Sequence, residues 1–166
     1  IVPEKGVHYL IDAFGKLDTD KKLVIAGGSS DSTEYYEQVK QMAAQDPRII
    51  LTGFVQGRML QELYSNAYIY VLPSDLEGMP MSLLEAMSYG NCCLTSDIAE
   101  CTEVVEDKAA HGSADALYKA LNELIRHPQK VQKYKNEAAD FITGKYSWDS
   151  VVDQTLALYK GEKVGE

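Results

Sequence analysis

The sequence predicts an α/β fold, in which a Rossmann-like parallel sheet carries helices on both faces and the C-terminus is helical. Short runs rich in β-branched residues alternate with stretches whose apolar residues recur at helical spacing. The connecting segments are short, and such alternation is typical of βαβ units in a parallel sheet. The chain has 166 residues, of which 45% are hydrophobic and 25% are charged. This length and composition are sufficient for one domain with its own hydrophobic core.

The elements can be assigned in order along the chain. The first helix is expected at residues 6–17, where one face is apolar: Val7, Leu10, Ile11, Phe14 and Leu17. Four strands are expected, at residues 22–28, 48–54, 67–74 and 91–97. Further helices are expected at residues 30–45, 57–67, after Met79, and at 98–107. From residue 113 to about residue 160 the pattern is helical almost throughout, and Trp148 and Tyr159 are expected to pack against the core or a neighbouring helix.

Composition excludes some functions. The formal net charge of −9 argues against broad contact with nucleic acid, which requires a basic face. No apolar stretch is long enough to span a bilayer, and no signal-peptide pattern opens the chain. The three cysteines include the adjacent pair Cys92 and Cys93, and they predict buried thiols of a reducing compartment. We therefore expect a cytoplasmic protein. The three histidines form no metal-ligand spacing, so no metal site is predicted.

Residues 73–90, PSDLEGMPMSLLEAMSYG, contain one glutamate in a turn and another inside an apolar helix. If Pro80 begins that helix, the free backbone N–H groups from Met81 onward attract an anion, phosphate above all. Gly78 lets the backbone approach a ligand closely. Glu85 falls about a turn and a half into the helix, where burying a carboxylate is costly unless a donor such as a sugar hydroxyl binds it. The alternative is that both glutamates face water, as most glutamates do.

The same segment resembles the donor-site motif of the group 1 (family 4) retaining glycosyltransferases, whose pattern is P-S-x-x-E-G-x-P-x-x-x-x-E-A-M-x-x-G. Every fixed position of that pattern is matched. The resemblance extends over nearly the whole chain in order. PEKGVHYLIDAF, LVIAGG and RIILTGFV precede the motif, and SDIAECTEVVED and YSWDSVVDQTLALY follow it.

The resemblance implies the C-terminal half of the two-domain GT-B architecture, in which the N-terminal domain holds the acceptor and the C-terminal domain holds the nucleotide-sugar donor. Residues 1–166 would then form a single donor-binding domain, with its first strand truncated and the acceptor domain absent. The arginine that the family carries on that strand, shortly before the lysine of PEKG, is absent with it. The segment at residues 106–117, EDKAAHGSADAL, is shorter than the corresponding loop and strand of the family.

The resemblance also implies roles for individual residues. Glu77 would contact the donor sugar hydroxyls beside the reacting centre, and it is the expected catalytic residue. Glu85 would bind the ribose hydroxyls, and Lys5 would neutralise the diphosphate, since a compact ammonium suits a phosphate point contact. Val55 would meet the nucleobase, and Gly28 would let the nucleotide approach. Four consecutive residues would line the sugar and the diphosphate: Gly78, Met79, Pro80 and Met81.

The implied function is transfer of a hexosyl group from a nucleotide sugar, such as a UDP- or GDP-sugar, to an acceptor with retention of configuration, as in carbohydrate biosynthesis. No metal or other cofactor is implied, because Lys5 and the helix start would stabilise the leaving diphosphate. The expected partners are the nucleotide sugar and the missing N-terminal domain, without nucleic acid. Any contact with the cytoplasmic face of a membrane would belong to the absent half.

Two alternatives remain open. The chain could be a non-catalytic nucleotide-binding or scaffold module that keeps the fold without the chemistry. It could also be a Rossmann-type oxidoreductase domain, although the sequence has no G-x-G-x-x-G motif. If the chain is instead the donor-binding domain of a glycosyltransferase, we expect the isolated chain to bind nucleotide and not to transfer sugar by itself.

Overall fold

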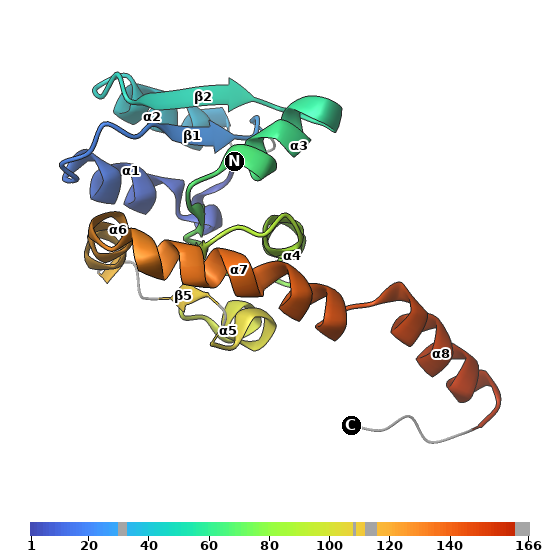
Figure 1. The fold of residues 1–166 in the computed structure, drawn as a ribbon. Helices are drawn as coiled ribbons and strands as arrows, with labels where there is room; N and C mark the ends of the chain where they lie inside the picture. Colours follow the sequence, from blue (N-terminus) through green and yellow to red (C-terminus); the bar gives the residue numbers. More distant parts are fainter. Residues whose placement is uncertain (30–32, 108, 112–115, 162–166) are drawn as a thin grey trace.

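The computed structural model describes residues 1–29, 33–107, 109–111 and 116–161 (Figure 1). Its strands are β1 (Leu23–Ala26), β2 (Ile49–Gly53), β3 (Tyr70–Leu72), β4 (Cys93–Thr95) and β5 (Ala110–His111). The helices that alternate with them are α1 (Val7–Gly15), α2 (Thr33–Ala43), α3 (Gly57–Asn66), α4 (Met81–Ser88) and α5 (Ala99–Val105). A 3-10 turn, η1 (Pro3–Lys5), precedes α1. After β5 come α6 (Leu117–Arg126), α7 (Pro128–Lys145) and α8 (Trp148–Tyr159).

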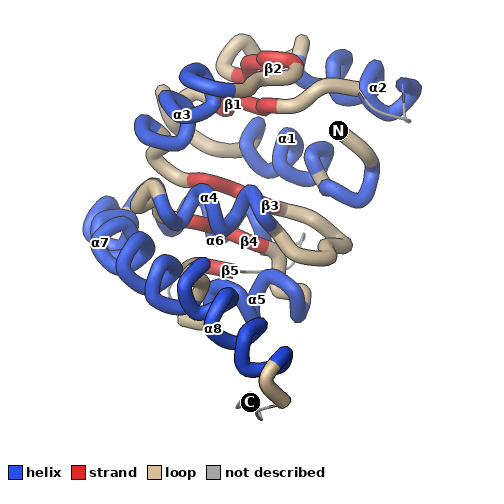
Figure 2. Tube along the Cα trace, turned by 90° about the vertical axis from the view of Figure 1, so that its right-hand side faces the viewer, coloured by secondary structure: helices blue, strands red, loops and turns tan. Residues whose placement is uncertain are grey.

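The strands are all parallel and form two hydrogen-bonded groups, β1-β2 and β3-β4-β5. Leu23 lies opposite Ile49 in the first group, and Tyr70 lies opposite Cys93 in the second. Figure 2 shows the two groups edge to edge, in the order β2, β1, β3, β4, β5, so that β1 and β3 face each other. The predicted α/β fold with parallel strands is confirmed.

The four predicted strands all form, and each is shorter than predicted. β5 was not predicted, because a strand of two residues is too short to show the β-branched run by which a strand is recognised. Residues 108 and 112–115 lie outside the described residues, and they belong to the segment at residues 106–117 that is shorter than in the family.

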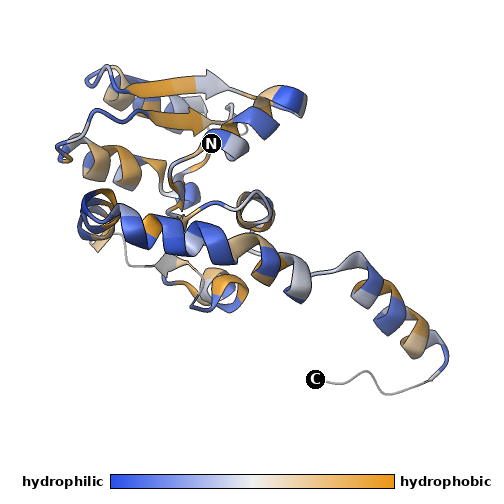
Figure 3. Cartoon of the chain, in the orientation of Figure 1, coloured by the Kyte–Doolittle hydropathy of each residue, from blue (hydrophilic) through white to orange (hydrophobic). Residues whose placement is uncertain are grey.

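Buried apolar side chains form three clusters around the strands. α1 contributes to two of them, because Leu10 and Phe14 pack toward α6 whereas Ile11 packs with α2 and β1. The third cluster joins α4 and α5 to β3 and β4, with Leu83 and Met87 fully buried. Figure 3 shows hydrophobic residues along β1 and β2 and hydrophilic residues on the outward side of α7. The core therefore lies between the helices and the strands, as the helical spacing of α1 predicts.

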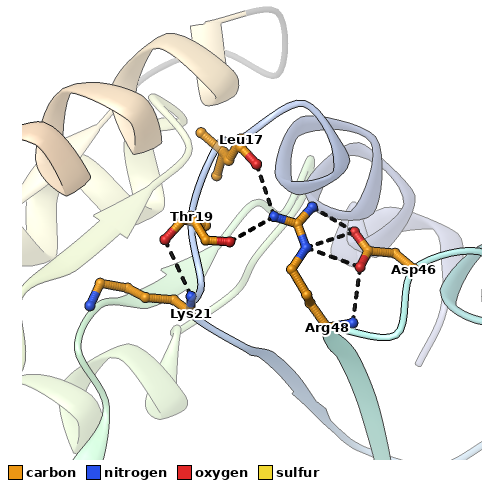
Figure 4. A network of polar contacts seen from close by, with 5 residues as sticks. All are labelled: Leu17, Thr19, Lys21, Asp46 and Arg48. Carbon is orange, nitrogen blue, oxygen red and sulfur yellow. Dashed lines mark hydrogen bonds and ion pairs between the residues drawn. The ribbon is translucent and has the colours of Figure 1, made fainter.

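The guanidinium of Arg48 connects the residues just before β2 to the segment that follows α1 (Figure 4). Arg48 donates to the carbonyls of Leu17 and Thr19 at 2.9 and 3.0 Å, and its Nη2 donates to Asp46 at 2.7 Å. The guanidinium also lies over the ring of Phe14, 4.9 Å from its centroid. Several acceptors around one guanidinium suit the fixed fork of arginine. This network lies at the amino end of β2, away from the carboxyl ends of the strands where the predicted site residues lie.

The three cysteines are free and buried, as predicted. Burial raises the pKa of Cys92 to about 12 and the pKa of Cys101 to about 11, so both thiols stay protonated at neutral pH. Of the helices in the described ranges, none is long and apolar enough to cross a membrane. The histidine, cysteine and carboxylate side chains of the described residues form no cluster of three that could hold a metal ion.

α8 projects from the body of the molecule (Figure 1) and buries no residue. Trp148 is 83% exposed and Tyr159 is 85% exposed, so the expectation that these two residues pack is wrong. Their spacing along α8 is that of an amphipathic helix, but no other part of the described structure covers the apolar side.

Candidate functional site

The carboxyl ends of β1 and β2 lie side by side, and the predicted residues Gly28 and Val55 follow them. The N–H of Gly27 donates to the carbonyl of Gly53 at 2.9 Å. A Cβ built on Gly28 would lie 3.7 Å from the Cβ of Phe54, so Gly28 is next to the segment that contains Val55. Phe54 itself is 77% exposed. An exposed aromatic ring at the end of a strand is able to stack on a flat ligand.

The first residues of the chain connect this end of β1 to the end of β3. The amino group of Ile1 donates to the carbonyl of Gly28 at 2.6 Å. The N–H of Asp75, just after β3, donates to the carbonyl of Glu4 in η1 at 2.8 Å. Residues 1–6 therefore run across the carboxyl ends of two parallel strands, where ligands of α/β proteins bind.

Gly6 fixes how α1 meets the segment that follows β3. Its φ is +62°, and a Cβ added to it would lie 2.0 Å from the carbonyl oxygen of Pro73. A glycine is required there both by the left-handed backbone and by the close approach. This contact brings the preceding residue, Lys5, to the turn that contains Glu77.

Lys5 and Glu77 form an ion pair in which Nζ lies 2.8 Å from Oε1. The hydroxyl of Ser74, which is fully buried, donates to the same oxygen at 2.6 Å. The Glu77 side chain is only 8% exposed, whereas that of Lys5 is 41% exposed. A carboxylate so buried needs these donors, because an unpaired buried charge is costly. The structure thus brings together the two predicted residues Lys5 and Glu77, and leaves the ammonium partly open to solvent.

The start of α4 differs in detail from the prediction. Pro80 is the N-cap residue and has φ −76° and ψ 73°, and the helix begins at Met81. These angles are those of an inverse γ-turn, and the N–H of Met81 accordingly donates to the carbonyl of Met79 at 2.8 Å. The expectation that the Met81 N–H is free is therefore wrong. No side chain caps the helix, and Met79 and Met81 are 48% and 59% exposed while Pro80 is buried.

Glu85 lies on the surface of α4, and the expectation that its carboxylate is buried is wrong. The buried side of the helix is formed by Leu83, Ala86 and Met87, and residue 85 lies outside that stripe. The carboxylate is nevertheless held, because the hydroxyl of Tyr64 donates to Oε2 at 3.1 Å. Glu85 is thus accessible and also fixed.

Two tyrosines of the neighbouring elements donate to α4, the buried Tyr64 and the partly buried Tyr70. Tyr70 on β3 donates its hydroxyl to Oγ of Ser82 at 2.8 Å, which ties the first turn of α4 to the sheet. Burial raises the pKa of Tyr70 far above its usual range, and burial together with the charge of Glu85 raises the pKa of Tyr64. Both hydroxyls therefore remain protonated donors at neutral pH.

Three residues of the site were not identified from the sequence: Phe54, Tyr64 and Ser74. Ser74 belongs to the fixed positions of the motif at residues 73–90, and a serine three residues before a glutamate is the available signal. Tyr64 meets Glu85 only through the packing of α3 on α4, for which the sequence carries no local signal. Phe54 follows Gly53 directly, and an aromatic residue just after a strand-ending glycine could have drawn attention to it.

Comparison with known proteins places the chain in a family. Residues 1–141, well over half of the chain, match the family described as Glycosyl transferases group 1. The chain belongs to this family. The resemblance of the motif at residues 73–90 to group 1 glycosyltransferases is confirmed, and α8 lies beyond the matched residues.

This group 1 glycosyl transferase chain is 29% identical to alpha-maltose-1-phosphate synthase of Mycobacterium tuberculosis over 176 residues. That match covers 96% of the chain and 46% of the synthase. The chain therefore spans about half the length of this curated relative.

Among solved structures, the group 1 glycosyl transferase chain is similar to Anabaena HepE in complex with UDP and glucose. The TM-score is 0.87 at 19% identity, covering 97% of this chain and 46% of HepE. It is also similar to the C-terminal domain of a glycosyl transferase group 1 family protein from Francisella tularensis, with a TM-score of 0.78 at 23% identity over 89% of this chain and 83% of that one. At these identities the likeness shows the fold, which is that of a GT-B C-terminal domain as predicted.

Proposed function

We propose that this chain is the donor-binding half of a retaining glycosyltransferase, which binds a nucleotide-diphosphate sugar and transfers its hexosyl group to an acceptor. The observation that carries the proposal is the placement of Lys5 against Glu77 at the start of α4, 2.8 Å apart. These two residues are far apart in the sequence, and the fold brings a cation and an acid to the edge where the strands end.

A cation at this place suits the chemistry of sugar transfer. Breaking the anomeric C–O bond leaves an oxocarbenium-like sugar, while negative charge develops on the departing nucleoside diphosphate. Preorganised positive potential stabilises that charge. Lys5, whose side chain is 41% exposed, has three donors and can reach the diphosphate while it stays paired with Glu77, and the uncapped start of α4 adds positive potential. The proposal assigns this stabilisation to Lys5 and the helix start, and not to a metal ion.

The two carboxylates have different roles in this proposal. Glu77 is the catalytic residue that contacts the donor sugar, since Oε1 is bound by Lys5 and Ser74 while Oε2 has no donor among the described residues. Glu85 binds the ribose hydroxyls, because it is exposed and a ligand can reach it. Carboxylates are suited to both tasks, since an ionised carboxylate only accepts hydrogen bonds and a sugar hydroxyl can donate one.

The remaining donor contacts follow the carboxyl ends of the strands. Val55 meets the nucleobase, and Gly28 leaves room for the nucleotide beside Phe54. The residues proposed to line the sugar and the diphosphate are Gly78, Met79, Pro80 and Met81. The complex of Anabaena HepE with UDP and glucose supports a UDP-sugar as the donor.

The domain organisation belongs to the same proposal. Residues 1–166 form one donor-binding domain whose first strand is truncated, and the acceptor domain lies in the part of a longer protein that corresponds to the other half of the relatives. A cytoplasmic location, with any membrane contact in that other half, stays a prediction. Sugar transfer by the isolated chain to a defined acceptor would contradict this organisation.

A nucleotide titration tests the proposal. The chain is titrated with UDP, UDP-glucose, GDP and ADP while thermal unfolding and NMR shifts are recorded. A nucleotide at 100 times its Kd stabilises the fold that binds it by about 2.7 kcal/mol. We expect the largest response with UDP and UDP-glucose. Lys5→Ala should weaken UDP binding about tenfold, because it removes a charge-assisted contact to phosphate.

Lys16→Ala is the matched control. Lys16 is an exposed lysine at the other end of α1, so its removal changes the net charge equally and should leave UDP binding unchanged. A chain that responds to none of the nucleotides would support the scaffold alternative, and a chain that binds NAD selectively would support the oxidoreductase alternative. Either result would overturn the proposal.

A further inference from the structure

Tyr64 lies in the last turn of α3 and contacts the acid of a different helix. Its hydroxyl donates to Oε2 of Glu85 at 3.1 Å. Tyr64 is 9% exposed, so this donor comes from the interior to a carboxylate on the surface. Within the described ranges, no other group donates to the side chain of Glu85, and its Oε1 is left for a ligand.

The ring of Tyr64 contacts two aromatic neighbours. It stacks on Tyr89, with centroids 5.4 Å apart and an interplanar angle of 23°. It also lies 5.9 Å from the ring of Tyr70, centroid to centroid, at an interplanar angle of 45°. Such packing restricts the ring to one orientation. The hydroxyl is therefore a fixed donor.

The backbone of Tyr64 is also tied to α4, the helix that carries Glu85. Nδ2 of Asn91 donates to the carbonyl of Tyr64 at 2.9 Å and to the carbonyl of Ala86 at 3.0 Å. Asn91 is 2% exposed, and a buried amide with both bonds made holds its partners in register. The end of α3 and the second half of α4 thus behave as one unit.

We infer that Tyr64 is a positioning residue, which fixes the Glu85 carboxylate so that its free oxygen, Oε1, meets the ribose hydroxyls of the nucleotide. The inference rests on the proposed function. It adds a connection within the site, because α3 begins two residues after Val55 and ends beside Glu85. One helix therefore links the proposed nucleobase contact to the proposed ribose contact.

A comparison of UDP with 2′,3′-dideoxy-UDP tests this inference. The two probes differ only in the ribose hydroxyls. The Kd of the dideoxy analogue divided by the Kd of UDP therefore reports the ribose contact. We expect the unmodified chain to bind UDP at least about tenfold more tightly than the dideoxy analogue. Tyr64→Phe should lower this ratio about threefold to tenfold while the Kd of the dideoxy analogue stays the same. Glu85→Gln should also lower it, and the double variant should lose no more than Glu85→Gln does alone.

Tyr89→Phe is the matched control. Tyr89 stacks on Tyr64, and its hydroxyl has no hydrogen-bond partner among the described residues. The variant keeps the aromatic stack and removes one hydroxyl from the same cluster, so the ratio should be unchanged. A merely structural role of the tyrosine cluster would instead affect both probes equally.

A second measurement needs no nucleotide. The ionisation of the Tyr64 hydroxyl, followed by ultraviolet difference or NMR titration, should occur at lower pH in Glu85→Gln, because burial and the charge of Glu85 raise the pKa of Tyr64. A chain that binds no UDP would overturn the proposed function together with this inference. UDP binding with an unchanged ratio in Tyr64→Phe would overturn the inference alone. If Tyr64→Phe fails to fold, an unchanged Tyr64 titration in Glu85→Gln would overturn it.

Discussion

The approach of Gly6 to Pro73 sets the position of Lys5. Gly6→Ala should lower the free energy of unfolding by at least about 2 kcal/mol, because alanine is strained at positive φ and its methyl group would meet a backbone oxygen. The backbone cannot yield as a flexible side chain would, so α1 must shift away from the segment after β3. We therefore expect UDP binding to weaken as well. Chemical denaturation and the nucleotide titration measure the two effects.

Gly15→Ala provides the control on the same helix. Gly15 has ordinary helical backbone, and a Cβ built on it would have no atom within 4 Å. This variant should raise the free energy of unfolding by about 0.5–1 kcal/mol, since alanine favours the helix and restricts the unfolded chain. Equal effects of the two substitutions would show that the contact with Pro73 does not hold the site.

The residues that sequence reasoning identified are those whose neighbours in the chain mark them. Glu77 lies in a turn with Gly78 and Pro80, and the resemblance of this local motif to a known family gave it its expected role. Tyr64 and Phe54 were not identified, because their roles depend on residues that are near only in space. Tyr64 contacts Glu85 on α4, and Phe54 lies beside Gly28. The errors at Met81 and Glu85 have the same origin. Tertiary packing determines both the γ-turn at Pro80 and which side of α4 is buried. The periodicity of the sequence alone does not predict either.

At the scale of elements, α8 shows how an amphipathic pattern can predict a helix and leave its partner undetermined. Trp148, Val152, Leu156 and Tyr159 recur at helical spacing, and the helix forms as predicted. All four are at least 47% exposed, because no described element covers them. The spacing is a property of the sequence, whereas burial requires a surface that the described part of the chain does not provide.

Removal of α8 should therefore leave the rest of the fold intact. A chain that ends at Tyr146 should differ from the full chain by less than about 1 kcal/mol in the free energy of unfolding, since α8 buries no side chain. It should also associate less at high concentration, because an exposed apolar stripe is removed. Denaturant titration and light scattering measure these quantities. A loss of stability well beyond that value would mean that α8 packs on the body in solution.

At the scale of the whole molecule, the fold class followed from the alternation of strands and helices, and the pairing of the strands did not. Parallel strands buried on both faces read as apolar runs, so the sequence gives no sign of which runs are adjacent. The structure answers this, with β1 at the edge of one group and β3 at the edge of the other. The edges formed by β1 and β3 face each other, and no strand of the described structure is hydrogen-bonded between them (Figure 2).

An extended segment added before Ile1 should pair with both edges. Ile1 already lies at the carboxyl end of β1, and η1 continues to the end of β3, so a chain entering from before Ile1 would run parallel to both. About seven residues alternating threonine and valine, each rising about 3.3 Å, would match the strands. We expect the amides of β1 and β3 to exchange more slowly, and the free energy of unfolding to rise by about 1–3 kcal/mol, because two new strand pairs form.

The control is an extension of equal length with proline at alternate positions, which cannot complete the ladder and should change neither quantity. Equal protection with both extensions would show that β1 and β3 do not offer paired edges to a strand between them.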